Sequence, residues 1–184
     1  MYSLDEYAAE LRRITRATSD YAEIFDKVAP LARKLALSKV SWLKPRHYEV
    51  DEEQGFGVHP LREEPDHSLA IFVAAWGPHR GAPPHDHGTW AVVAGVEGEE
   101  RNVKYNRLDD RSRSDYAELE KRCTFAAGAG DVICLRPRGI HSVWNDSDRV
   151  TLSLHTYGRH VSYTERSAFN PETNEATPFV VRIK

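Results

Sequence analysis

The spacing of apolar runs changes after about residue 41, and this change limits the folds open to the chain most strongly. From Trp42 onward the runs are short and rich in β-branched and aromatic residues. Clusters of Gly, Pro, Asp and Asn separate them at intervals of about ten residues, which is typical of antiparallel barrels and sandwiches. We therefore predict a mainly β, double-sheet jelly roll. Its expected strands are 45–50, 55–60, 68–76, 84–87, 90–97, 99–107, 118–126, 131–135, 140–145, 149–157 and 178–183.

The first forty residues have helical periodicity instead. Ser3 followed by Glu6 forms a capping box, and apolar residues then recur at helical spacing, which predicts a helix over 3–18. A second helix is predicted over 20–38, with Pro30 expected to kink it or to start a new helix. We expect one domain over 1–184, in which 1–40 form a helical cap and 41–184 form the β-barrel.

Length and charge exclude several classes of protein. The 184 residues carry a formal net charge of −3, which does not suggest a nucleic-acid partner. No apolar stretch approaches the roughly 20 residues of a membrane span. The acidic, amphipathic N-terminus is not a secretory signal, so we expect a cytoplasmic protein. Two cysteines are too few for a disulfide framework, and no particular oligomeric state is indicated.

Two histidines stand two residues apart in the stretch Pro83–Gly98. On a strand, positions i and i+2 point to the same face, so His85 and His87 can aim their imidazoles at one point. A metal ion is the usual reason for such an arrangement, although two surface histidines in a proline-rich turn would give the same spacing.

A second stretch, Gly130–Asn145, has similar punctuation and carries His141. Together the two stretches resemble the two sequence motifs of the cupin superfamily, which implies that His85, His87 and His141 bind a metal. The glutamate that often completes this ligand set would fall near Ala91 or Val92, and neither can bind a metal. Three imidazoles leave positions of the metal open and suit Fe, Zn, Ni or Cu.

Polar and apolar residues alternate along 150–158. The period of two puts Ser153, His155 and Tyr157 on one strand face. This face is either exposed on an edge strand or a buried polar ladder that orients the tyrosine hydroxyl.

A more specific resemblance joins these features. The segment Pro84–Trp90, the Gly98-x-Glu100 pair, the His141 motif and the Ser153–Tyr157 ladder together resemble the cysteine dioxygenase family of thiol dioxygenases. The resemblance covers about Leu69 to Arg166. It implies one Fe(II) per chain, held by three histidines, and a reaction that adds dioxygen to a small thiol to give a sulfinic acid. It also implies catalytic roles for Ser153, His155 and Tyr157.

Two departures relate the sequence to the bacterial members, which include 3-mercaptopropionate dioxygenases. Animal cysteine dioxygenases have a cysteine, cross-linked to the tyrosine, near the position of Ala91. Their carboxylate-binding arginine lies on an early strand, whereas the bacterial enzymes resemble this chain at Arg166. Guanidinium geometry suits a carboxylate. The alternatives are that Arg166 is a surface arginine paired with Glu165 or Glu172, and that His59 lines the pocket.

We therefore expect an iron-dependent thiol dioxygenase acting on cysteine or 3-mercaptopropionate. The alternatives are another metal-dependent cupin enzyme, such as a dioxygenase or isomerase with a non-thiol substrate, and a non-catalytic cupin that binds a metal or small molecule. Four further histidines are expected to be solvated and three tryptophans to pack around the site: His47, His67, His79, His160, Trp76, Trp90 and Trp144.

Overall fold

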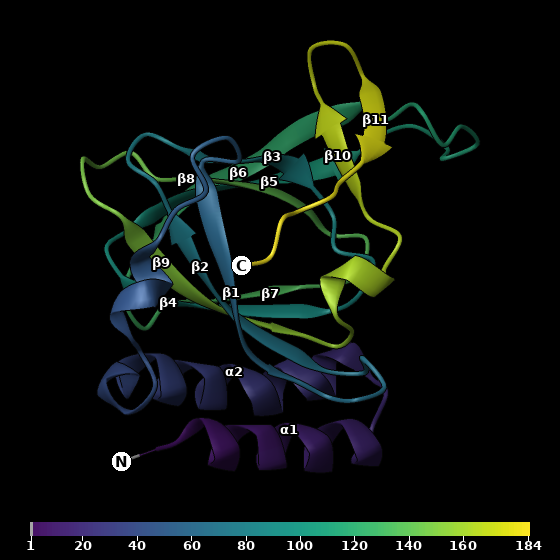
Figure 1. The fold of residues 1–184 in the computed structure, drawn as a ribbon. Helices are drawn as coiled ribbons and strands as arrows, with labels where there is room; N and C mark the ends of the chain where they lie inside the picture. The colour runs from purple at the N-terminus through teal and green to yellow at the C-terminus, as the bar shows by residue number, and fades with distance from the viewer. Residues whose placement is uncertain (1) are drawn as a thin grey trace.

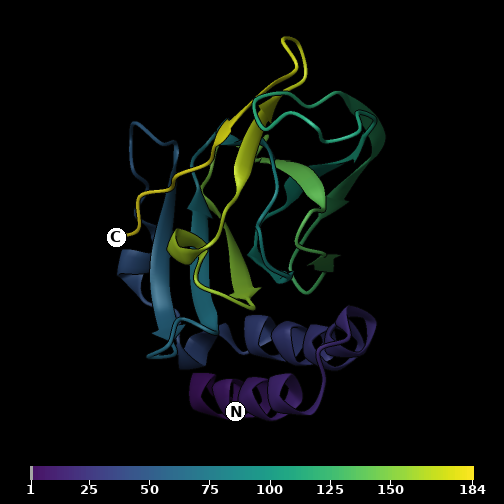
Figure 2. The same ribbon diagram turned by 90° about the vertical axis from the view of Figure 1, so that its right-hand side faces the viewer.

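A computed structural model describes residues 2–184. Two helices, α1 (Leu4–Ala17) and α2 (Tyr21–Leu37), precede two facing β-sheets and lie against one of them (Figures 1 and 2). The strands are β1 (Phe56–Glu63), β2 (Ala70–Trp76), β3 (Gly81–His85), β4 (Ala91–Glu97), β5 (Glu100–Arg107), β6 (Leu119–Ala127), β7 (Val132–Leu135), β8 (Ile140–Trp144), β9 (Thr151–Tyr157), β10 (Ser167–Asn170) and β11 (Glu175–Pro178). Short 3₁₀ helices are η1 (Lys39–Ser41), η2 (Pro45–Tyr48) and η3 (Val161–Tyr163).

Both helices begin at the predicted caps. The Ser3 hydroxyl accepts from the Glu6 backbone N–H, and the Glu6 carboxylate accepts from the Ser3 backbone N–H in return. The Asp20 carboxylate accepts from the backbone N–H of Glu23. Pro30 lies inside one continuous α2, so it does not start a new helix, although its missing N–H removes one helical hydrogen bond.

The strand order is that of a jelly roll. One sheet has the order β1-β2-β9-β4-β7, and the other has the order β11-β10-β3-β8-β5-β6. Strands β2 to β9 contribute four neighbouring strands to each sheet, β2-β9-β4-β7 and β3-β8-β5-β6. The paired strands are antiparallel. This order is a pair of interlocked Greek keys, so the predicted fold class is confirmed.

The two faces of β9 explain how a polar ladder comes to be buried. Leu152, Leu154 and Thr156 face the helices, where Leu152 and Leu154 join the main apolar core and Thr156 Oγ1 lies 2.7 Å from the Tyr7 hydroxyl. The alternate residues face the barrel interior instead. The helices therefore cover the outside of the sheet and leave the inside for the polar side chains.

Two strand predictions were wrong, and two strands were missed. Residues 45–50 begin with η2 instead of a strand, because Pro45 occupies the first position of a helical turn. Strands β10 and β11 were not predicted. Past Pro178 the chain continues without strand pairing toward the C-terminal end marked in Figure 1. The apolar alternation of 178–183 has another cause, since Phe179 and Val181 pack against the barrel interior.

Among residues 2–184, no helix is long and apolar enough to cross a membrane.

Candidate metal centre

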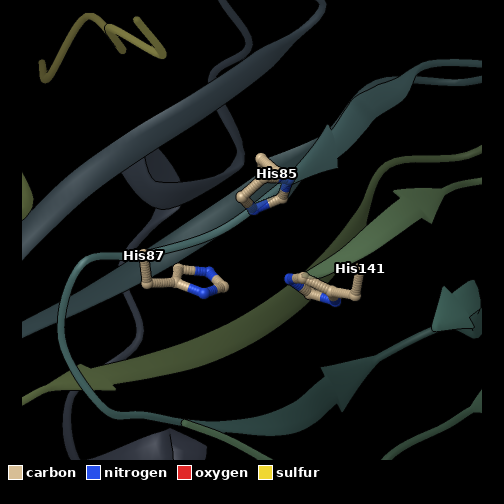
Figure 3. Close-up of side chains that lie close together, drawn as sticks. All are labelled: His85, His87 and His141. Carbon is tan, nitrogen blue, oxygen red and sulfur yellow. The ribbon is translucent and has the colours of Figure 1, made fainter. Parts of the chain in front are cut away.

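Three histidines converge inside the barrel. His85 ends β3, and His141 lies directly opposite it on β8. His87 lies beyond the end of β3, in the following loop. The prediction that His85 and His87 share a strand face was therefore wrong. One ring nitrogen of each histidine nevertheless lies within 4.8 Å of the other two, and all three side chains are buried. Figure 3 shows the imidazoles turned toward one another.

Neighbouring oxygens fix the tautomers of two of these rings. His85 Nδ1 lies 2.8 Å from the Pro83 carbonyl oxygen, and His141 Nδ1 lies 3.2 Å from Asn102 Oδ1. A carbonyl oxygen accepts only, so each Nδ1 carries the proton and each Nε2 keeps its lone pair. Within residues 2–184, His141 Nε2 and both ring nitrogens of His87 are buried without a hydrogen-bond partner.

Burial keeps the three rings neutral. Burial, and then the charge of Arg166, lowers the pKa of His85 to about 3. Burial, followed by the neighbouring histidines, lowers the pKa of His87 and His141 well below 6.5. Neutral imidazole is the form that binds metals, so buried lone pairs without partners fit a divalent transition metal such as Fe, Zn, Ni or Cu.

The position of the usual fourth ligand is apolar here. Ala91 lies on β4 directly opposite Tyr157 of β9, and it is fully buried. In the part of the chain that the structure describes, no carboxylate or thiol joins the three histidines. Cys123 and Cys134 lie on β6 and β7, so neither occupies the position opposite Tyr157.

The side chains of Ser153, His155 and Tyr157 form a continuous buried chain of hydrogen bonds. Ser153 Oγ lies 3.0 Å from His155 Nε2, and His155 Nδ1 lies 2.8 Å from the Tyr157 hydroxyl. The indole N–H of Trp76 donates to Ser153 Oγ over 3.0 Å. The face is thus a buried ladder and not an exposed edge. The Tyr157 ring lies 5.5 Å from that of His87, centroid to centroid, so the chain ends beside the histidines.

A small cavity lies between two of the three histidines, His85 and His141, and the end of the ladder at His155 and Tyr157. Its volume is about 40 Å³, and its polar lining comes from His85, His141, His155, Tyr157 and Arg166. The rest of the wall is apolar, with contributions from Phe72, Trp76, Val143 and Phe179. Burial lowers the pKa of His155 to about 3 and raises the pKa of Tyr157 to about 12, so both are neutral near pH 7.

Arg166 lies in this cavity and not on an exposed surface. It is 9% exposed, it has no ion pair within residues 2–184, and its Nε is buried without a partner. Its guanidinium carbon lies 4.4 Å from the centre of the Phe179 ring. The predicted alternative, a surface pair with Glu165 or Glu172, is wrong. Arg166 and Phe179 also border a larger surface hollow, so they separate the cavity from solvent.

His59 does not line this cavity. Its Nε2 lies 2.8 Å from the Glu49 carbonyl oxygen, and its ring packs beside His47. His47 and His160 were predicted to be solvated but are buried, whereas His79 is exposed as predicted. The buried rings accept backbone hydrogen bonds, from Lys44 N at His47 and from Ser162 N at His160.

The three tryptophans have different surroundings. Trp76 lines the cavity as expected, whereas Trp90 packs in the core beneath the helices. Trp144 is 38% exposed and does not line the cavity, so its prediction was wrong. Asn102 was not predicted. The period of two that revealed the ladder on β9 would have placed Asn102 and Glu100 together on the inner face of β5.

Comparisons with known proteins give only distant structural matches. No family model matches the chain. An oxalate oxidase in complex with glycolate matches 60% of this chain and 56% of its own, with a TM-score of 0.46 and 17% identity. A double-stranded β-helix protein from Klebsiella pneumoniae matches 68% of this chain and 94% of its own, with a TM-score of 0.47 and 12% identity. An RmlC-like cupin from Desulfovibrio desulfuricans matches 59% of this chain and 86% of its own, with a TM-score of 0.43 and 18% identity.

The chain has a cupin fold. Its own strand order, and not these distant similarities, carries that conclusion. The matched region spans just over half the length of the oxalate oxidase, and nothing about reaction or substrate follows from the match.

Proposed function

We propose that this protein is an iron-dependent thiol dioxygenase that converts a small thiol carboxylate, cysteine or 3-mercaptopropionate, into its sulfinic acid. One observation carries the proposal: Tyr157, whose hydroxyl is bonded to His155 and through it to Ser153, lines the same small cavity as His85, His141 and Arg166. A metal-binding cupin with another reaction has no evident need for this buried ladder.

Fe(II) suits the three neutral imidazoles, and it would supply the electron transfer with dioxygen while keeping positions free for substrate. His85, His87 and His141 would hold it. The backbone oxygen of Pro83 and the side-chain oxygen of Asn102 orient two of these rings, which makes them better ligands.

Arg166 would bind the substrate carboxylate. Its guanidinium is the one cationic side chain in the cavity wall, and such a group can give a carboxylate two parallel hydrogen bonds. The buried Nε, which has no partner in residues 2–184, is one donor available for that purpose. Because the wall is otherwise largely apolar, water is excluded and this ion pair is strengthened.

Tyr157 would donate a hydrogen bond to the reacting groups. Burial keeps its hydroxyl protonated, and the bond to His155 fixes its direction. Ala91, opposite Tyr157, has no thiol, so no cross-link restrains the phenol ring. The overall reaction is balanced by its two substrates: the thiolate sulfur loses four electrons, dioxygen gains four, and both oxygen atoms end in the sulfinate.

The proposal is tested by loading the protein with Fe(II) without air and then adding oxygen with each thiol. We expect thiol-dependent oxygen uptake together with sulfinate formation. Binding of iron without thiol-dependent uptake would contradict it.

A further inference from the structure

The hydrogen-bond chain on β9 continues past Ser153 to a buried carboxyl group. Glu100, the first residue of β5, is 4% exposed. Its Oε1 accepts from Thr151 Oγ1 over 3.5 Å, and the Ser153 hydroxyl faces the same carboxyl and opposes the rise of its pKa. Glu100, Ser153, His155 and Tyr157 thus form one series of neighbouring polar groups that ends at the cavity.

Among the residues that the structure describes, no charged side chain pairs with Glu100. The groups that face its carboxyl are the hydroxyls of Thr151 and Ser153 on β9. On the neighbouring strand β6, the residue paired with Glu100 is Ala127. Nearby charged side chains pair elsewhere: Arg101 with Asp146, and Glu97 of β4 with Lys39. Burial raises the pKa of Glu100 to about 8, although the two hydroxyls oppose the shift. The carboxyl therefore changes protonation state close to neutral pH.

The donors around Ser153 make the chain reversible. The indole N–H of Trp76 can only donate, so it always uses one lone pair of Ser153 Oγ. The serine hydroxyl has one proton left to give, either to Glu100 or to His155 Nε2. Whichever group does not receive that proton must donate to Ser153 instead.

We propose that Glu100 is a positioning residue that sets the direction of this hydrogen-bond chain and thereby the direction in which Tyr157 donates. The consequence for catalysis rests on the proposed function, whereas the reversal itself does not. As an acid, Glu100 donates to Ser153, Ser153 donates to His155 Nε2, and His155 Nδ1–H donates to the Tyr157 oxygen. The phenol proton then points into the cavity.

As a carboxylate, Glu100 reverses each of these bonds. Ser153 donates to the carboxylate, His155 Nε2–H donates to Ser153, and the phenol proton is given to His155 Nδ1. Tyr157 can then only accept from groups in the cavity. One proton leaves at Glu100, and the tautomer of His155 changes without a change in its charge.

The tautomer of His155 can be measured without any turnover. We suggest ¹⁵N NMR of histidine-labelled full-length protein loaded with Zn(II), which is diamagnetic, from about pH 6 to about pH 10. We expect the His155 proton to move from Nδ1 to Nε2 with a midpoint near the pKa of Glu100. In Glu100→Gln the tautomer should not change over this range, whereas the exposed neighbour variant Glu99→Gln should behave as wild type.

A second variant protects the test against misfolding of Glu100→Gln. Ser153→Ala keeps Glu100 but cuts the chain, so the His155 tautomer should again be insensitive to pH. An unchanging tautomer in the wild type, or the same change in Glu100→Gln, would overturn the inference.

Activity gives a separate readout. In the iron-loaded enzyme, kcat should fall about tenfold between about pH 7 and about pH 9, as one ionisation near pH 8 requires, and Glu100→Gln should lack this fall. If the tautomer reverses but no thiol is oxidised, the proposed function fails and the role of Glu100 in the chain stands. If thiols are oxidised but the tautomer does not respond, only the inference about Glu100 fails.

Discussion

The Tyr157 hydroxyl lies 2.8 Å from His155 Nδ1, two residues away on the same face of β9. Tyr157→Phe removes this hydroxyl and leaves the ring in place. We expect kcat for thiol oxidation to fall about 10²-fold, the scale of one positioned proton donor, while the iron content stays unchanged. Tyr163→Phe, on a half-exposed tyrosine outside the cavity, is the matched control. Loss of iron in Tyr157→Phe would instead indicate a structural role.

Asn102 should influence metal affinity without touching the metal. Its Oδ1 fixes the tautomer of His141, so Asn102→Ala should weaken metal binding about 10–100-fold, as loss of such orienting groups usually does. His87→Ala should abolish binding, because it removes a ligand. Competition with a chelator measures both effects. Asn106→Ala, at an exposed position on the same strand, should bind the metal as wild type does. Equal affinity in Asn102→Ala would refute the orienting role.

Arg166 should determine affinity for the substrate carboxylate. Arg166→Gln removes a charged donor, and a hydrogen bond to a charged group contributes about 1.5–3 kcal/mol. We therefore expect KM for a thiol carboxylate to rise roughly 10–100-fold. A thiol that lacks the carboxylate should be affected little. An exposed control, Arg122→Gln, should leave both constants unchanged. An equal loss for both kinds of thiol would argue against a carboxylate site.

Glu100 should make stability depend on pH. Its pKa is about 8 in the folded chain and close to 4.5 when unfolded, so between these values the folded state holds the extra proton. The free energy of unfolding then falls by about 1.4 kcal/mol for each pH unit as the pH rises through this window. Glu100→Gln lacks this loss. Denaturant titrations of both proteins should show that the free energy of unfolding of the wild type falls relative to that of the variant from pH 5 to pH 8. A constant difference between the two free energies would contradict the burial effect.

The regular parts of the fold could be predicted because local chemistry determines them. Ser3 and Asp20 cap the helices through bonds within their own first turn. Alternation along β9 revealed a polar face, since period two depends only on the strand itself. The strand predicted at Pro45 is a local 3₁₀ turn, whereas the alternation around Phe179 comes from packing against segments distant in sequence.

The site was predictable where motif and spacing agreed and unpredictable where burial decided. His85, His87 and His141 meet as the two motifs imply. His47 and His59 are buried against the backbone near η2. No local sequence pattern predicts the burial of these two side chains. Neither the bond from Asn102 to His141 nor the contact of Glu100 with Ser153 could be identified, because both depend on the register between strands.

The central claim is that this cavity inserts dioxygen into a thiol. The most direct test supplies ¹⁸O₂ to the iron-loaded protein with cysteine or 3-mercaptopropionate and follows the product by mass spectrometry. We predict a sulfinate that carries both labelled oxygen atoms, formed one for each dioxygen consumed. Disulfide without labelled sulfinate, or no product from iron-loaded protein, would contradict the account.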